Sequence, residues 1–257
     1  MSVDPDPADL PPVWAVSLRR AVERREFVQA VYSELGLQPV LVDAVDGRAL
    51  STAQLAEYSD LRAAYAFGRS LRKAEIAIAL SHLAIWRRMV DEQLAEVLVV
   101  EDDVRPDAGL LRVLEARERL PADADVVTMH SLFSWATPRP VDGPALVDGY
   151  RVCTYERTPM GAQAYLLRRR GACRLVDVAR PIRLPADELL FRARPAGLRV
   201  YGVEPSPVGH DEFPSELHAA PAGDDDRTLF ERIAFSPVRA AGRIARRVRS
   251  GTWHRPR

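Results

Sequence analysis

The stretch VLVVEDDV, residues 97–104, carries an apolar run directly into three carboxylates, Glu101, Asp102 and Asp103. Such a run predicts a buried strand, and open α/β sheets bind their ligands at strand ends. Carboxylate oxygens suit magnesium and manganese. If the chain stays extended, Glu101 and Asp103 face the same side. These residues therefore predict a divalent-cation site, unless the acids only end the strand and begin a turn.

A strand that leads into acidic residues is typical of two classes of protein. Receiver domains of response regulators place the acids on their first strand and use a lysine further along to hold a phosphoryl group. Here two strand units precede the acids, and no lysine follows Asp103, because Lys73 is the only lysine. The pattern favours the second class, nucleotide-sugar glycosyltransferases, in which a cation neutralises the charge that builds on a departing diphosphate.

The composition narrows the class of protein further. The 257 residues carry 36 basic and 36 acidic side chains, so the formal net charge of zero argues against a nucleic-acid binder. The two cysteines, Cys153 and Cys173, have neither metal-finger nor disulfide-framework spacing. The start of the chain lacks a secretory pattern, and no apolar run reaches the roughly 18 residues that cross a bilayer. We expect a protein of a reducing compartment.

Hydrophobic periodicity predicts alternating strands and helices, the grammar of an α/β fold with an open, mostly parallel sheet. Strands are expected at 12–18, 39–47, 97–100, 125–131, 162–168 and 198–205. Helices are expected at 23–36, 71–93, 107–120 and 171–180. Residues 51–70 read as a short helix and a loop, and 132–160 as a long loop rich in proline and glycine.

The two ends differ in composition from the rest. Residues 1–12 read as a disordered leader, and 13–235 as one domain. The stretch 236–257 is a basic tail that contains arginines and no acid. Aromatic and arginine residues suit an anionic membrane surface, whereas the plain interpretation is a solvated basic tail.

Four blocks in order give the chain a resemblance to glycosyltransferase family 25, the lipopolysaccharide and procollagen-type glycosyltransferases. The blocks are WAVSLRRAVERRE (14–26), VDAVDG (42–47), AEIAIALSHLAIW (74–86) leading into VLVVEDDV, and GAQAYLLRRRGACRLV (161–176) followed by PADELL. The Ser-His helix before the acidic strand is the most specific of them. The resemblance implies a GT-A fold, a Rossmann-like single domain with a mostly parallel central sheet flanked by helices.

Site residues follow from the same resemblance. It implies nucleotide-sugar contacts at Leu18, Arg19, Arg24, Asp46, Ser81, His82, Glu101, Asp102 and Gly161. It implies a Mn²⁺ or Mg²⁺ ion held by Asp103, Glu101 and His210. Several of these positions also have plain structural interpretations. Arg24 could be a solvated helix residue, Ser81 a core hydroxyl and His82 a satisfied core histidine.

The family is inverting, and inversion needs a base that takes the proton of the acceptor hydroxyl. Asp187 in PADELL is the candidate for this base, with Glu188 behind it. The alternative role for Asp187 is to begin a helix, since Asp is a preferred N-cap residue. The two roles are compatible.

The expected activity is metal-dependent transfer of a hexose, galactose from UDP-galactose first, to a cell-surface glycan or lipid-linked acceptor. The expected location is the cytoplasm, with peripheral contact at the inner membrane face through the basic tail. A catalytically inactive nucleotide-sugar or glycan-binding relative in a surface-polysaccharide system is the alternative. Another donor, such as UDP-glucose, an N-acetylhexosamine donor or a GDP-sugar, is a third interpretation, because a few hydroxyl contacts decide donor choice.

Overall fold

The computed structural model describes residues 10–130, 140–155, 160–191, 196–210 and 213, with a few isolated positions between 237 and 245. The chain divides into two compact units. The first comprises Met1–Ala44, Ser81–Val178 and Ala186–Phe213, and the second comprises Val45–Leu80, Ala179–Pro185 and Pro214–Arg257. The expected leader, single domain and basic tail stay predictions, because much of 1–12 and 236–257 lies outside the described residues.

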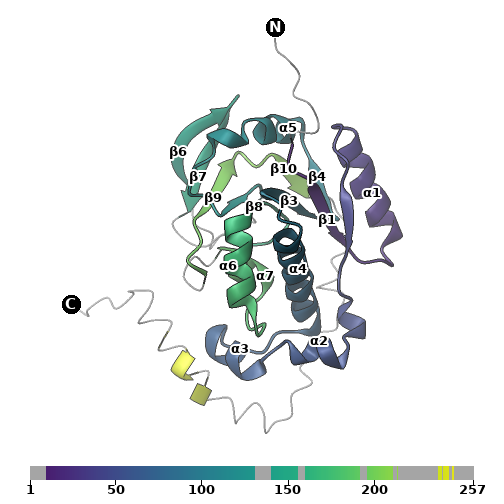
Figure 1. The fold of residues 1–257 in the computed structure, drawn as a ribbon, viewed down its shortest axis with the longest axis vertical. Helices are drawn as coiled ribbons and strands as arrows, with labels where there is room; N and C mark the ends of the chain where they lie inside the picture. The colour runs from purple at the N-terminus through teal and green to yellow at the C-terminus, as the bar shows by residue number, and fades with distance from the viewer. Residues whose placement is uncertain are drawn as a thin grey trace, which may run out of the picture. The chain divides into compact units, whose positions relative to one another are not determined.

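An eight-stranded sheet forms the centre of the first unit, in the order β2-β1-β3-β8-β5-β9-β7-β6 (Figure 1). Its strands are β1 (Val13–Ser17), β2 (Val40–Asp43), β3 (Glu96–Glu101), β5 (Val126–Thr128), β6 (Pro140–Val147), β7 (Tyr150–Tyr155), β8 (Ala164–Arg168) and β9 (Val200–Glu204). The pairings require β2, β1, β3, β5, β9 and β6 to point one way, and β8 and β7 the other. The predicted α/β class with a mostly parallel sheet is confirmed. A separate antiparallel pair joins β4 (Val104–Pro106) to β10 (Val208–His210).

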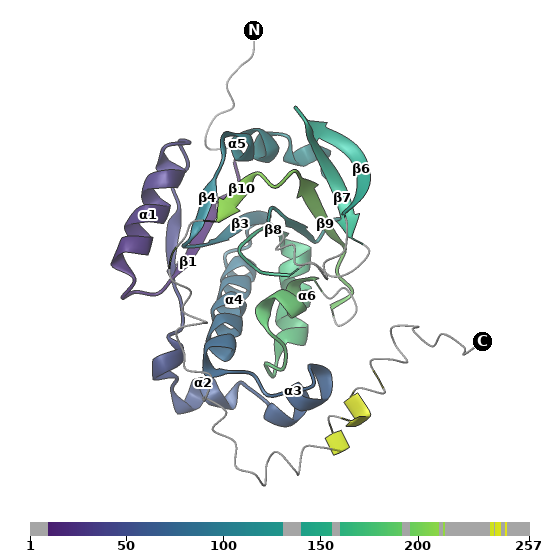
Figure 2. The same ribbon diagram turned by 180° about the vertical axis from the view of Figure 1, so that it is seen from behind.

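Helices cover both faces of this sheet (Figures 1 and 2). The helices α1 (Val22–Ser33) and α5 (Ala108–Glu115) lie on one face. The helices α4 (Lys73–Asp91) and α6 (Arg169–Ala179) lie on the other, and α4 belongs to the first unit from Ser81 onward. Two short elements complete the unit, η3 (Arg117–Arg119) and α7 (Ala186–Phe191). Because both faces are covered, β1 and the interior of β3 are buried along their length.

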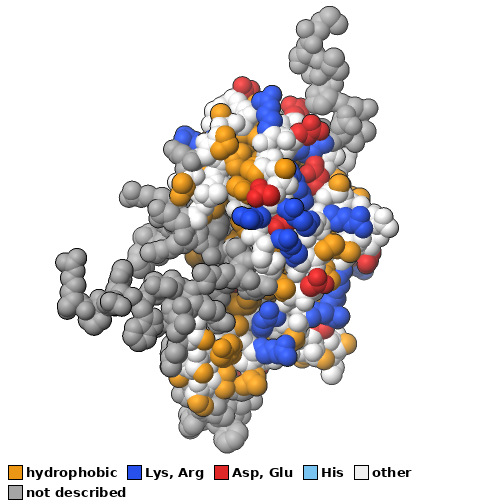
Figure 3. Space-filling view, turned by 60° about the vertical axis from the view of Figure 1, so that its left-hand side comes forward, with side chains coloured by type: hydrophobic (Ala, Val, Ile, Leu, Met, Phe, Trp, Pro, Cys, Tyr) orange, Lys and Arg blue, Asp and Glu red, His pale blue; other side chains and the backbone are white. Residues whose placement is uncertain are grey.

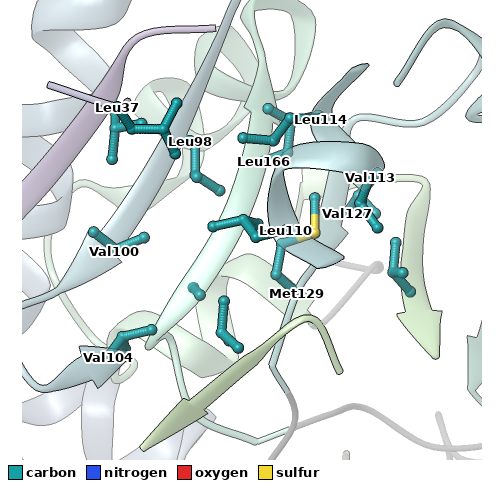
Figure 4. Close-up of a cluster of buried hydrophobic side chains, with 14 of the residues drawn as sticks. Leu37, Leu98, Val100, Val104, Leu110, Val113, Leu114, Val127, Met129 and Leu166 are labelled. Atoms are coloured by element: carbon teal, nitrogen blue, oxygen red, sulfur yellow. The ribbon is translucent and has the colours of Figure 1, made fainter. Parts of the chain in front are cut away.

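Strand alternation distributes these buried residues between the two faces. Leu98 and Val100 of β3 pack in one cluster with Leu110 and Leu114 of α5 (Figure 4). The intervening residue, Val99, is equally buried but stands outside this cluster. The apolar strand VLVV is therefore held by packing on both of its faces, and its end determines where the acidic residues begin.

The second unit contains η2 (Gly47–Ala49), α2 (Thr52–Ala56), α3 (Asp60–Ala66) and the first part of α4. Side-chain caps start its short helices. Ser51 and Gln54 form a capping box at α2, and the Ser59 hydroxyl accepts the Arg62 N–H at α3. The segment expected to hold one short helix and a loop thus holds two helices, each begun by a serine.

The loop expected over 132–160 is wrong for residues 140–155, which form the hairpin β6–β7. Pro140 is tolerated because β6 is an edge strand, and Pro144 falls where the β6–β7 register shifts. The turn is Asp148-Gly149, and both residues have positive φ. The predicted strand at 198–205 is confirmed as β9, and the short strand β10 follows it.

The surface is mixed in charge. On the face shown in Figure 3, basic side chains lie next to acidic ones, in keeping with the formal net charge of zero. Within the described part of the chain, no helix combines the length and apolarity needed to span a membrane.

Candidate functional site

The carboxyl ends of β1 and β3 define the candidate site. β1 pairs with β2 on one side and with β3 on the other, all parallel. The chain continues from β1 to β2 on one side and later adds β3 on the other side of β1, so the strand order reverses at β1. Open α/β sheets bind ligands at such a switch in strand order. Ser17 ends β1 and Glu101 ends β3. The acidic triplet therefore lies where the topology alone would place a ligand site.

Asp102 is buried and held from two directions. The Ser17 hydroxyl donates to its Oδ2 at 2.6 Å, and Arg24 Nη1 donates to its Oδ1 at 2.6 Å. Burial raises the pKa of Asp102, while the Ser17 hydrogen bond and the Arg24 charge act in the opposite direction. Both oxygens of this carboxylate are thus engaged within the protein.

Arg24 also reaches the next carboxylate. Its Nη2 donates to Asp103 Oδ2 at 2.9 Å, so one planar guanidinium spans two adjacent acids. The Phe213 ring lies 5.3 Å from the guanidinium carbon, within the range of a cation–π contact. The Arg24 side chain is therefore largely buried against the acidic turn, and the interpretation of it as a solvated helix residue is wrong.

The three acids differ in their access to solvent. The side chain of Glu101 is 29% exposed, against 7% for Asp102 and 12% for Asp103. Only Glu101 lies on the strand, because the chain turns at Asp102 and Asp103 before β4 begins. The expectation that Glu101 and Asp103 share one face of an extended chain is therefore wrong. The turn instead brings the two aspartates to Arg24.

The segment 161–163 joins this cluster to the predicted base. The Glu101 N–H donates to the Gln163 carbonyl at 2.7 Å, because β8 runs antiparallel to β3 and begins where β3 ends. Two residues earlier, the Gly161 N–H donates to Asp187 Oδ2 at 3.3 Å. Asp187 Oδ1 accepts the Glu188 N–H at 2.9 Å, near the start of α7. The structure thus connects Glu101, Gly161 and Asp187 through one short run of backbone.

His82 and Ser81 are buried in α4, as is Tyr165 in β8. His82 Nδ1 lies 2.8 Å from the Tyr165 hydroxyl, which Trp86 Nε1 also approaches at 3.1 Å. His82 Nε2 lies 3.9 Å from Glu101 Oε1. Burial raises the pKa of Tyr165, so this phenol keeps its proton. The predicted Ser-His helix thus brings an imidazole to the acidic strand.

Other predicted positions make contacts that do not involve the acidic triplet in the described structure. Leu18 follows β1 directly, and its carbonyl accepts the Ala21 N–H. Arg19 pairs with Asp43 at the end of β2, and this hydrogen bond, with a second from Arg25, holds the pKa of Asp43 below its usual value. Asp46 lies in the second unit, where it accepts the Arg48 N–H and begins η2.

His210 ends β10, and the β4–β10 register sets its backbone opposite Val104, the residue after Asp103. The side chain of His210 lies outside the described part of the structure. Its predicted role as a metal ligand therefore stays a prediction.

Sequence reasoning did not anticipate Ser17 or Tyr165 as parts of this network. Both could be found by one signal, a polar atom on an otherwise apolar strand that must find a buried partner. Ser17 ends the apolar run VWAVS, just as Glu101 ends VLVVE. Their partners depend on which strands are neighbours, and a local pattern does not contain that information.

The donor atoms suit a hard cation shared with a ligand. Among the described side chains, no three of His, Cys, Asp and Glu are grouped so that they could hold a metal ion by themselves. Magnesium, however, is commonly bound by one or two carboxylates together with substrate phosphates. Glu101, whose side chain is partly open to solvent, and Asp103, two residues later in the turn, supply carboxylate oxygens of the kind that such a site uses.

Known proteins are similar in sequence to parts of this chain. The sequence model of "Glycosyltransferase family 25 (LPS biosynthesis protein)" matches residues 10–136. The human "Inactive glycosyltransferase 25 family member 3" is 29% identical over 238 residues, which cover 90% of this chain and 37% of that protein. The mouse "Procollagen galactosyltransferase 2" is 30% identical over 132 residues, 48% of this chain and 21% of that protein.

This chain thus spans well under half the length of these curated relatives. A solved glycosyltransferase, described as involved in glycosylation of the major capsid of PBCV-1, aligns with 66% of this chain and 66% of its own. Its TM-score of 0.34 and sequence identity of 10% are too low to support a conclusion. The matched region, residues 10–136, contains β1, Arg24, the Ser-His helix and the acidic strand, and over this region the chain is similar to glycosyltransferase family 25.

Proposed function

We propose that this chain transfers a hexose from a nucleotide sugar to a glycan or lipid-linked acceptor, with UDP-galactose as the first donor to test. The observation that carries the proposal is the acidic turn at the β1–β3 switch point, fixed by Ser17 and Arg24 and bordered by the more exposed Glu101. Galactose is favoured because one relative is named a procollagen galactosyltransferase.

The donor would lie against the carboxyl ends of β1 and β3. Asp103 and Glu101, with His210 as a further ligand, would hold Mn²⁺ or Mg²⁺, which when bound neutralises charge on the leaving diphosphate. Arg24 holds both aspartates in place. The Arg19 side chain, which is highly exposed, would contact the nucleotide together with the backbone at Leu18.

The acceptor would be activated by a carboxylate. In an inverting displacement, the acceptor oxygen forms a bond to the anomeric carbon as the bond to the nucleoside diphosphate breaks, and the hydroxyl proton passes to the base. Asp187 is the proposed base, because the Gly161 N–H ties it to the segment that also contacts Glu101. Glu188, next in α7, is the second candidate. The product linkage would be β.

A binding protein without turnover is the alternative, and two observations favour it. The human relative is named inactive, and Arg24 already occupies one oxygen of each aspartate. Such a protein would bind a nucleotide sugar or glycan within a surface-polysaccharide system. It predicts donor binding without nucleotide release.

The proposed location is the cytoplasmic face of a membrane that carries the acceptor. The basic stretch 236–257 would hold the protein there through its arginines. Deleting residues 236–257 should release the protein from vesicles that contain anionic lipid. Unchanged vesicle binding after the deletion would refute this part of the proposal.

The test separates binding from turnover. Purified protein is mixed with UDP-galactose, UDP-glucose, a UDP-N-acetylhexosamine or GDP-mannose, each with Mn²⁺ or with EDTA. Nucleotide release and calorimetric binding are both measured. We expect one donor to be hydrolysed in a metal-dependent way. Binding of a donor without release, even with glycan acceptors added, would support the alternative, and neither binding nor release would refute both.

A further inference from the structure

Three buried side chains, Trp86, Tyr165 and His82, form a series of polar contacts that leads to Glu101. All three side chains are 1% exposed or less. A buried donor or acceptor left without a partner costs free energy comparable to a lost hydrogen bond. We therefore place the hydrogen atoms of these three side chains so that each buried donor and acceptor has a hydrogen-bond partner wherever the contacts allow it.

The direction of the hydrogen bond between Trp86 and Tyr165 is determined by chemistry. An indole nitrogen only donates, so at 3.1 Å the Tyr165 oxygen accepts from Trp86 Nε1. The Tyr165 proton then needs an acceptor, and His82 Nδ1 lies 2.8 Å away. In the opposite arrangement, His82 Nδ1–H would donate to the Tyr165 oxygen. The Tyr165 proton would then have no acceptor among its contacts with described residues.

The tautomer of His82 follows from this step. If Nδ1 accepts, the neutral ring carries its proton on Nε2. Nε2 has no hydrogen-bond partner among the described residues, and it lies 3.9 Å from Glu101 Oε1. An N–H directed toward a carboxylate is favourable, whereas a ring lone pair directed there would be repelled. The separation of 3.9 Å is too long for a direct hydrogen bond. A small movement of the Glu101 side chain toward His82, or a water between the two atoms, would complete the contact.

We propose that the Tyr165 hydroxyl holds His82 in the Nε2–H tautomer, so that His82 acts as a positioning residue that donates toward Glu101 and orients its carboxylate. The effect on activity rests on the proposed function, since Glu101 lies in the proposed donor site. The tautomer itself does not depend on that function.

The first test is a tautomer measurement on the unmodified protein. Histidine labelled with ¹⁵N gives imidazole nitrogen shifts and N–H correlations that distinguish the two neutral tautomers, and a His82→Gln sample assigns the His82 signals among the five histidines. We expect His82 to carry its proton on Nε2, at a pH where its ring is neutral. A proton on Nδ1 would overturn the inference whatever the activity of the protein.

Two variants test the origin of the tautomer. Tyr165→Phe removes the hydroxyl that donates to Nδ1, so the Nε2–H signature of His82 should give way to a mixture of tautomers or to the Nδ1–H form. Trp86→Phe removes only the indole donor, and the Tyr165 hydroxyl can still donate to His82, so the signature should persist. Retention of a pure Nε2–H signature in Tyr165→Phe would overturn the proposed cause.

A matched pair of substitutions tests the positioning role. Glutamine places an amide N–H near the position of Nε2, whereas asparagine places it near Nδ1. We expect His82→Asn to lower kcat for nucleotide release about tenfold, as the loss of one charge-assisted hydrogen bond predicts, with partial rescue in His82→Gln. Equal losses in the two variants would reduce His82 to a packing residue. Absence of release in every sample, with the Nε2–H signature present, would count against the proposed function and leave the tautomer intact.

Discussion

At the residue scale, one arginine explains why the acidic turn can exist inside the protein. Asp102 and Asp103 are neighbours in sequence and both are largely buried, so two negative charges would repel each other at short range. The Arg24 guanidinium contacts both, and the Ser17 hydroxyl takes a further oxygen of Asp102. Removal of one partner from such a group leaves a buried charge uncompensated, which is costly.

Arg24→Lys should therefore be a damaging change although it keeps the charge. A lysine ammonium is a point charge that lacks the planar fork, so it cannot reproduce both contacts. We expect a stability loss of about 1–2 kcal/mol in urea unfolding and roughly tenfold slower nucleotide release. Arg112→Lys on the exposed side of α5 is the matched control, expected to change stability by less than about 0.5 kcal/mol. Equal behaviour of the two variants would contradict the role of Arg24.

At the element scale, the sequence predicted most strands and helices because each presents either a helical period or a short, continuous apolar run. VWAVS and VLVV are apolar throughout, as strands covered on both faces must be. The β6–β7 hairpin was missed because Pro140, Gly143 and Pro144 resemble a loop. The useful signal was Asp148-Gly149, since Asp-Gly is the preferred pair for a tight hairpin turn whose residues have positive φ.

The β6–β7 hairpin packs so closely against α5 that position 109 has no room for a side chain. A Cβ atom built on Gly109 would lie 1.8 Å from the Tyr150 hydroxyl oxygen. Gly109→Ala should thus lose about 1–3 kcal/mol in urea unfolding, although alanine usually favours a helix. In a Tyr150→Ala background the same change should cost nothing, and an undiminished cost there would show that the clash is not the cause.

The environment of Glu75, near the start of α4, predicts that the free energy of unfolding depends on pH. Burial raises the pKa of Glu75, but two hydrogen bonds from Arg69 and one from the Arg72 N–H outweigh it, and the pKa is lowered overall. The folded state therefore binds the proton less tightly than the unfolded state. The stabilisation is fully present above the ordinary glutamate pKa and is lost as the pH falls through the lowered folded value.

Glu75→Gln should accordingly reduce the free energy of unfolding by about 1 kcal/mol at neutral pH, a small value because Arg69 is partly exposed. The difference from the unmodified protein should shrink as the pH falls from about 5 toward 3. Glu92→Gln removes an exposed carboxylate that pairs with Arg88 after the same helix, and it serves as the control. A deficit for Glu75→Gln that is constant with pH would contradict the argument.

At the scale of the whole molecule, the site depends on contacts that no local pattern contains. The sequence predicted Glu101, Gly161 and Asp187 separately, but their connection requires β8 to run antiparallel beside β3. Likewise Arg24 and Asp102 are distant in sequence and meet because β1 and β3 are neighbours. The residue types were readable from the sequence, whereas their partners follow only from the strand order.

The most direct measurement is nucleotide release from UDP-galactose with Mn²⁺, compared between the unmodified protein, Asp103→Asn and Asp148→Asn. Asp148→Asn removes a carboxylate at the β6–β7 turn, where φ is +35° and asparagine is well tolerated. We expect release in the unmodified protein and in Asp148→Asn, and a loss of about a hundredfold or more in Asp103→Asn. Equal release from both variants, or release that EDTA leaves unchanged, would contradict a metal-dependent transferase centred on the acidic turn.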